Sequence, residues 1–148
     1  MKPIIRKAIL TDSGEISTLT AQLGYISDSQ SIYTRLNALL NHEEHCVYIA
    51  VSEGVIVGWI HGFFALRVES SPFIEIGGLV VHEAFRNRGI GKSLIDEVKI
   101  WATTIGCDKL RVRCNVKRIE SHEFYKNIGF KETKEQKIFD QISKNLKA

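Results

Sequence analysis

The sequence has few cysteines, no long apolar run and no strong excess of charge of either sign. Its three cysteines form no Cys-x-x-Cys pair, and their odd number argues against a secreted disulfide framework. No apolar run approaches the roughly 20 residues of a membrane span. The N-terminus reaches charged and turn residues too early for a signal peptide. We therefore expect a cytoplasmic protein with no membrane partner.

The charge is mild, at a net +3 over 148 residues. A nucleic-acid reader concentrates basic residues on one face, so we expect no nucleic-acid partner, and an anionic ligand would need a local site. The balance of 44% hydrophobic and 25% charged residues is that of an ordinary globular chain. A domain of about 150 residues hides roughly 70% of its unfolded surface, enough to fold without disulfides or a structural metal. We expect residues 1–148 to form a single domain with no metal site.

Hydropathy patterns predict an α+β fold. Period-two alternation predicts strands at 4–9, 46–53, 55–68, 73–81, 109–115 and 130–140. Helical signals predict helices from Asp12, with Glu15 completing a capping box, and at 29–41, 89–106 and 119–128. A whole helix separates the strands at 73–81 and 109–115, so these two strands should be parallel. The expected architecture is a mixed, mostly antiparallel central sheet flanked by about four helices.

One segment combines a strand, a glycine-containing loop and the start of an amphipathic helix. Gly89 and Gly91 allow the backbone to approach a ligand closely, and the first turn of the helix offers N–H groups that lack intrahelical partners. Arg86, Arg88 and Lys92 add positive charge. The pattern is typical of an anion cradle, although the glycines could also serve only to permit a turn. The full P-loop pattern is absent, and Leu94 stands where Gly-x-Gly-x-x-Gly requires a third glycine.

The spacing Arg86-x-x-Gly89-x-Gly91 resembles the acyl-coenzyme A pyrophosphate loop of the GNAT N-acetyltransferase superfamily. A second segment, Asn115-Val116-Lys117-Arg118 with His122-Glu123-Phe124-Tyr125 and Gly129-Phe130, looks like a later motif of the same superfamily. The residues of this second segment are similar to those of bacterial small-amine members such as aminoalkylphosphonate and aminoglycoside 6′-N-acetyltransferases.

The resemblance implies acetyl-CoA as acyl donor and a slot for its pantetheine arm, opened by splaying of the parallel strand pair. Backbone groups of the strand before the loop would hold that arm, and the loop would hold the pyrophosphate. Asn115 would orient the amides or a water, and Arg118 would approach the phosphates. The implied cofactor-binding residues are Leu79, Val80, Val81, Arg86, Asn87, Arg88, Gly89, Ile90, Gly91, Lys92, Asn115 and Arg118.

The chemistry of acetyl transfer needs a base for the amine and an acid for the leaving thiolate. Glu75 is the candidate base, since it lies on the strand before the loop, and a plain surface carboxylate is the alternative. Tyr125 matches the superfamily's usual general acid, with a packing role as the alternative. Gly77-Gly78 within the strand predicts either a β-bulge or a close packing contact. His42-Glu43-Glu44-His45 lacks the spacing of a zinc site and is expected to be a solvated turn.

We expect an N-acetyltransferase that acts on a small primary amine by direct attack in a ternary complex. The acceptor should lie among residues 23–33, 59–69 and the C-terminal strands. The alternatives are a protein or peptide acetyltransferase, a non-catalytic acyl-CoA sensor and an enzyme that acetylates charged tRNA, which the modest charge disfavours. Dimers are common among similar enzymes, so a homodimer is one candidate assembly.

Overall fold

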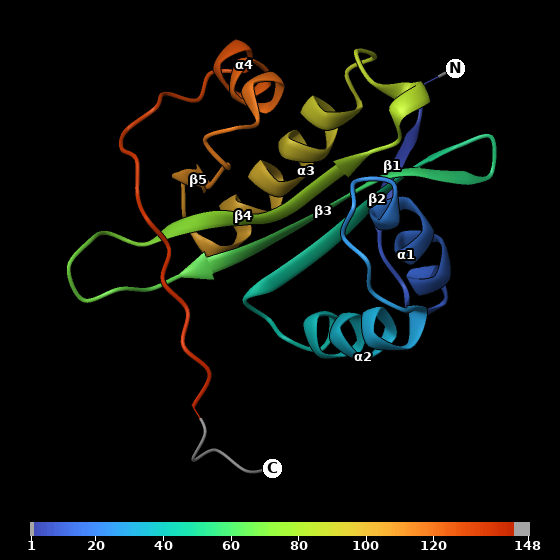
Figure 1. Ribbon diagram of the computed structural model, residues 1–148, viewed down its shortest axis with the longest axis horizontal. Coiled ribbons are helices and arrows are strands. Elements are labelled where there is room, and N and C mark those ends of the chain that lie inside the picture. Colours follow the sequence, from blue (N-terminus) through green and yellow to red (C-terminus); the bar gives the residue numbers. More distant parts are fainter. Residues whose placement is uncertain (1, 144–148) are drawn as a thin grey trace. The chain divides into compact units, whose positions relative to one another are not determined.

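The computed structural model describes residues 2–143, which form two compact units, residues 2–113 and 114–143. The first unit contains a five-stranded sheet whose spatial order follows the sequence (Figure 1). Its strands are β1 (Ile4–Lys7), β2 (His45–Ser52), β3 (Val55–Ala65), β4 (Phe73–Val81) and β5 (Leu110–Val112). Neighbours from β1 to β4 are antiparallel, and β4 pairs with β5 in parallel. The expected mixed sheet is confirmed.

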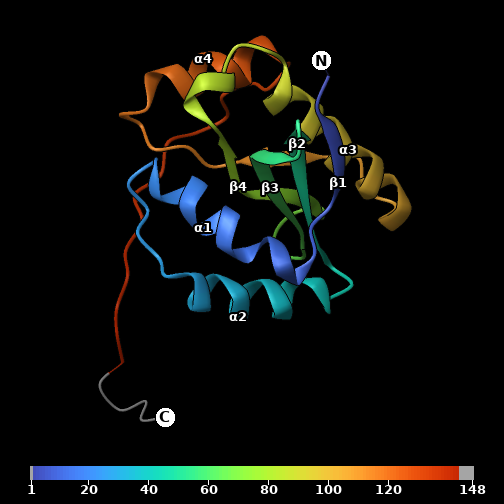
Figure 2. The same cartoon turned by 90° about the vertical axis from the view of Figure 1, so that its right-hand side faces the viewer.

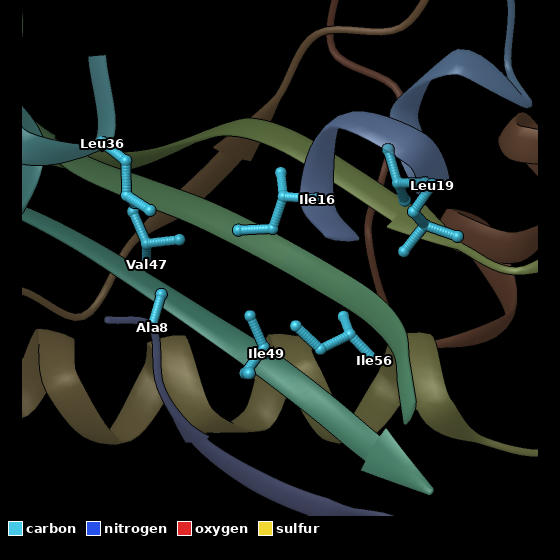
Figure 3. Packing of buried hydrophobic residues seen from close by; sticks show 8 residues of the cluster. Ala8, Ile16, Leu19, Leu36, Val47, Ile49 and Ile56 are labelled. Carbon is cyan, nitrogen blue, oxygen red and sulfur yellow. The ribbon is translucent and has the colours of Figure 1, made fainter. Parts of the chain in front are cut away.

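Helices cover both faces of this sheet. Helices α1 (Ser13–Ala21) and α2 (Ser29–Leu40) lie on one face and α3 (Ile90–Ile105) on the other (Figures 1 and 2). On the first face, Ile16 and Leu19 of α1 and Leu36 of α2 pack on the buried β2 residues Val47 and Ile49 (Figure 3). On the second face, Leu94, Ile95 and Val98 of α3 are almost completely buried. The apolar stripe predicted for this helix is therefore the one that forms the core.

The start of α1 differs from the predicted capping box. A 3-10 turn, η1 (Leu10–Asp12), precedes the helix, and the Asp12 carboxylate accepts a hydrogen bond from the backbone N–H of Ile9 at 2.8 Å. Asp12 also pairs with Arg6 at 3.0 Å, and Glu15 accepts from the backbone N–H of Ile56 at 3.1 Å. Both carboxylates therefore bind strand segments, because β1 and β3 bring donors that a helix start alone does not have.

Two irregularities in the sheet fix which side chains share a face. The register between β2 and β3 shifts at Ala50 and Val51, and the register between β3 and β4 shifts at His61 and Gly62. In the second shift Gly78 pairs with His61 and Ile76 with Gly62, so Gly77 is an extra residue in β4. The bulge predicted from Gly77-Gly78 is confirmed.

The second unit contains one helix, α4 (Ile119–Asn127), followed by Gly129 at φ 103°. The strand predicted at 130–140 is wrong, because residues 130–143 form neither helix nor strand. Ile138 and Phe139 are exposed, and charged and polar residues together outnumber the apolar ones in this stretch. Because the stretch has so few apolar side chains, a strand here would bury too little apolar area to be stable. In the described part of the chain, no helix has the length and apolar character needed to cross a membrane.

Candidate active site

The loop before α3 has a backbone shaped to hold an anion. After β4 the chain forms a short 3-10 turn, η2 (Glu83–Phe85), and then Asn87 and Gly89 both take left-handed conformations, at φ 64° and 80°. Left-handed residues between ordinary ones turn successive N–H groups to one side, which makes an anion-binding concavity. A Cβ placed on Gly89 would meet no heavy atom within 4 Å, so the space beside this backbone is open. The loop backbone is therefore shaped for an anion, and its contact with the pyrophosphate stays a prediction.

Helix α3 begins directly at this loop. Its first hydrogen bond runs from the N–H of Ser93 to the carbonyl of Gly89 at 3.0 Å, so the N–H groups of Ile90, Gly91 and Lys92 belong to the unpaired first turn. The positive end of the helix dipole adds to their attraction for an anion.

The basic side chains of this loop are held in different ways. Arg86 donates to the backbone carbonyl of Val81 at 3.4 Å, and the guanidinium of Arg88 lies 5.1 Å from the centre of the Phe85 ring. Lys92 instead pairs with Asp96, one turn along α3, at 2.9 Å. Two of the three predicted cations are thus fixed at the loop, whereas the charge of Lys92 is partly compensated on the helix surface.

Strands β4 and β5 pair over a short distance and then separate. Pairing covers Ile74 to Ile76 on β4, opposite Leu110 to Val112. Beyond Ile76 the edge of β4 that faced β5 has no strand partner among residues 2–143, while its other edge stays paired with β3 through Val81. The backbone of Leu79, Val80 and Val81 therefore runs along this edge toward the anion loop, and its contact with pantetheine stays a prediction.

Glu75 lies in the short segment where β4 and β5 still pair. Its carboxylate Oε1 accepts from Nε of Arg113 at 3.2 Å, and its side chain is 14% exposed. Glu75 stands opposite Phe63 of β3 and Arg111 of β5 in the sheet register, and paired residues share a face. The carboxylate is therefore on the face that α1 and α2 cover, two residues before the bulge. Glu75 is not a plain surface carboxylate, and its role as a base stays a prediction.

A histidine cluster lies on the same face. Nδ1 of His45 lies 2.9 Å from Nε2 of His61, and the two rings are stacked 5.2 Å apart. His42, in the turn before β2, meets His45 edge-on at 4.6 Å, and Phe63 lies about equally close to both His45 and His61. Burial lowers the pKa of His61 to about 4, and burial together with His42 lowers the pKa of His45. The expectation of a solvated turn at 42–45 is wrong for His45, the first residue of β2.

The glycines of the bulge leave room for this cluster. A Cβ on Gly77 would lie 2.6 Å from Nδ1 of His61, and a Cβ on Gly78 would lie 2.7 Å from the Trp59 ring. Trp59 is fixed from the other side, since its Nε1–H donates to Thr20 of α1 at 3.1 Å. The glycines therefore serve both as a bulge and as sites of close packing, the two alternatives that the sequence left open.

The second unit presents the other predicted residues. The ring of Tyr125 lies between those of Phe124 and Phe130, at 5.1 and 5.5 Å. Burial raises the pKa of Tyr125 to about 12. Asn115 begins a turn: its side chain accepts from the N–H of Lys117 at 2.9 Å, and its carbonyl lies 2.8 Å from Nε2 of His122. Arg118 directly precedes α4. These contacts order the segment that carries Tyr125.

Residues 2–143 give little support for a metal site or a catalytic thiol. No group of three or more His, Cys, Asp or Glu side chains in this range is arranged to hold a metal ion. Cys46 and Cys107 are buried, and burial raises the pKa of the Cys46 thiol to about 12. Sequence reasoning missed Arg113 as the partner of Glu75 and His61 as the partner of His45, because both pairs depend on the strand register.

Comparison with known proteins gives a consistent result. Residues 15–130 match the model of the acetyltransferase (GNAT) family. The chain is 30% identical over 105 residues to an aminoglycoside N(6')-acetyltransferase type 1 of Salmonella typhimurium, covering 68% of this chain and 72% of the relative. It is similar in structure to AAC(6')-Iy in complex with the bisubstrate analogue CoA-S-monomethyl-acetylneamine, with a TM-score of 0.85, 23% identity and coverage of 97% and 100%. It is also similar to an aminoglycoside 6'-N-acetyltransferase of Acinetobacter haemolyticus, with a TM-score of 0.84, 20% identity and coverage of 95% and 99%.

Proposed function

The chain belongs to the acetyltransferase (GNAT) family, and from this premise we propose that it transfers the acetyl group of acetyl-CoA to a primary amine of a small molecule. One observation carries the proposal: beyond Ile76 the edge of β4 that faced β5 has no strand partner in the described part of the chain, and β4 runs on into the left-handed loop at the start of α3. This edge suits the amide groups of pantetheine, and the loop suits the pyrophosphate. The acetyl thioester would then lie beside the bulge at Gly77.

The residues around this bulge can supply the first step of acetyl transfer. A free alkyl amine has a pKa near 10 and is mostly protonated at pH 7, so it must lose a proton before it attacks. We propose that Glu75 accepts this proton, directly or through a water. The carboxylate also attracts the ammonium form electrostatically. The amine nitrogen then attacks the thioester carbonyl directly, with both substrates bound.

Collapse of the intermediate breaks the C–S bond and releases the coenzyme A thiolate. We assign Tyr125 as the group that protonates this sulfur, because its phenol stays protonated at neutral pH. Asn115 and Arg118 are proposed to contact the pantetheine and the phosphates. The family match at 15–130 includes parts of both units, which supports one functional domain over residues 1–148.

The acceptor is proposed to be a small amine, in line with relatives named as aminoglycoside acetyltransferases. Its site would include the face of β3 and β4 that carries Trp59, Phe63 and Glu75. The expected contribution of C-terminal strands is withdrawn, since residues 130–143 form none.

A thiol-release screen with acetyl-CoA tests the proposal. The panel contains aminoglycosides, polyamines, amino acids, aminophosphonates and lysine peptides, and calorimetry measures coenzyme A binding in parallel. We expect thiol release with at least one small amine. Release with peptides alone would replace the proposal with a protein acetyltransferase. Coenzyme A binding without release on any amine would indicate the sensor.

A further inference from the structure

Three imidazoles form a row from the bulge of β4 to the surface of the first unit. His61 abuts Gly77, since a Cβ on that glycine would lie 2.6 Å from Nδ1 of His61. The other nitrogen of His61, Nε2, lies 2.9 Å from Nδ1 of His45. His45 in turn meets the edge of His42, which is exposed in the turn before β2. His61 thus has one nitrogen at the bulge and the other against His45, while Nδ1 of His42 accepts from the backbone N–H of Glu44 at 3.1 Å.

The proposed reaction requires a second proton acceptor. A primary ammonium carries three N–H protons, and the amide product keeps one. One of the two protons lost goes to Glu75 before attack. The nitrogen loses the other after the C–N bond has formed, when it is positively charged and more acidic than the original ammonium. A neutral imidazole can accept such a proton.

We propose, on the basis of the proposed function, that His61 and His45 form a proton relay that removes this second proton from the acylated nitrogen. Nδ1 of His61 accepts it, the proton on Nε2 of His61 passes to Nδ1 of His45, and the proton on Nε2 of His45 passes to water. The C–S bond then breaks, and the sulfur takes its proton from Tyr125. His61 is the catalytic residue of the pair, and His45 acts through it.

The contact between the two rings suits such a transfer. One nitrogen must donate and the other accept, so there are two tautomeric arrangements of the neutral pair. In the first, His61 donates and its Nδ1 is a bare acceptor at Gly77. In the second, His45 donates and Nδ1 of His61 carries a proton. These two arrangements are the states before and after one relay step.

The surroundings keep the pair neutral near pH 7. Burial disfavours the charged form of His61, whose pKa is about 4, and of His45, whose pKa is also lowered. The titratable groups that act on the pair are His42 and Glu44 in the turn before β2. Glu75, which pairs with Arg113, stands opposite Phe63, whose ring lies against both histidines. A neutral pair does not retain the proton that it passes on.

Two variants and a matched control test the relay kinetically. His61→Ala should reduce kcat at least about tenfold, and added imidazole should restore it in a saturable manner. His45→Phe keeps a stacked ring but cannot accept a proton, so kcat should also fall at least about tenfold while the KM for acetyl-CoA is unchanged. Cys46→Ala changes the neighbouring β2 residue on the α3 face and should stay within about threefold of the wild type. Loss in His61→Ala without imidazole rescue, or wild-type kcat in His45→Phe, would overturn the relay.

Nitrogen-15 NMR of the histidine rings in the free protein provides a test that needs no turnover. At pH 7 we expect a bare Nδ1 on His61, a proton on its Nε2, and changes in the His61 signals on His45→Phe substitution. A proton fixed on Nδ1 of His61 would overturn the relay even if the enzyme acetylates an amine. If no amine is acetylated in the screen, the proposed function fails, and the spectrum still decides whether the pair can carry a proton.

Discussion

Nε of Arg113 lies 3.2 Å from Oε1 of Glu75, so the candidate base is held by a guanidinium that directly follows β5. The pair joins β4 to the chain after β5 next to the point where the two strands separate. The carboxylate side chain is 14% exposed and that of Arg113 is 35% exposed. In this position an ion pair orients the carboxylate more than it stabilises the fold. The catalytic value of Glu75 should therefore depend on Arg113.

A double-mutant cycle measures this dependence. Glu75→Gln should lower kcat by roughly 10²-fold or more with nearly unchanged acetyl-CoA affinity, because a general base contributes about 10² to 10⁴. Arg113→Gln should lower kcat by a smaller factor, about 3- to 10-fold. The double variant should be no slower than Glu75→Gln, because Arg113 acts through the carboxylate. Losses that multiply, or a Glu75→Gln effect below about threefold, would show that the base lies elsewhere.

The anion loop can be tested with two glycines of equal backbone strain. Gly89 and Gly106 stand at opposite ends of α3, at φ 80° and 81°, and an added Cβ on either would meet nothing within 4 Å. Gly89→Val should weaken acetyl-CoA binding at least tenfold, about 1.4 kcal/mol, because its side chain occupies the space beside the loop backbone. Gly106→Val should cost similar stability and leave the affinity unchanged. Calorimetry that finds equal affinities for both variants would remove the pyrophosphate from this loop.

If Tyr125 is the general acid, removing its hydroxyl should lower kcat by a similar factor at every pH. With a pKa of about 12, its phenol stays protonated through pH 10. An alkyl thiol has a pKa of about 8.5, so the thiolate can also leave without help and the loss is moderate. Tyr125→Phe should lower kcat by about 10- to 10³-fold, by a similar factor from pH 6 to 10. Wild-type rates across this range would show that the hydroxyl is not the acid.

The buried histidines predict acid sensitivity of the fold. The pKa of His61 is about 4 in the folded protein, below its ordinary value of 6.5, so the unfolded chain binds the extra proton. The stability that this group contributes is complete above pH 6.5 and is lost as pH falls from 6.5 to 4. One such group changes the free energy of unfolding by at most about 1.4 kcal/mol per pH unit. In urea titrations between pH 4 and 6.5, the free energy of unfolding of His61→Phe should depend less steeply on pH than that of the wild type or of Cys46→Ala. Equal slopes would contradict the assigned burial.

Most of the fold followed from local sequence signals. The strand at 73–81 and the helix ending at Gly106 have the predicted bounds because alternation, helical period and glycine stops agree there. The tail at 130–143 misled the prediction, since alternation among charged residues says nothing about a partner strand. The predicted capping box at Asp12 and Glu15 did not form, because their carboxylates accept from Ile9 and Ile56 outside the helix.

The histidine pair depends on a register that the sequence does not reveal. The turn at Glu53-Gly54 pairs Ser52 with Val55, and an unbroken register would place Gly62 opposite His45. His61 would then point to the opposite face. The irregularity at Ala50 and Val51 shifts the pairing by one residue, so Phe63 stands opposite His45 and His61 shares its face. The Glu75–Arg113 pair likewise depends on the register between β4 and β5.

Transfer of acetyl from acetyl-CoA to a primary amine can be measured by mass spectrometry of a reaction with isotopically labelled acetyl-CoA and the amine found by the screen. We expect one labelled acetyl group on the amine nitrogen for each coenzyme A thiol released, with no acetyl group left on the protein. Thiol release without an acetylated amine, or an acetyl group retained on the protein during turnover, would contradict it.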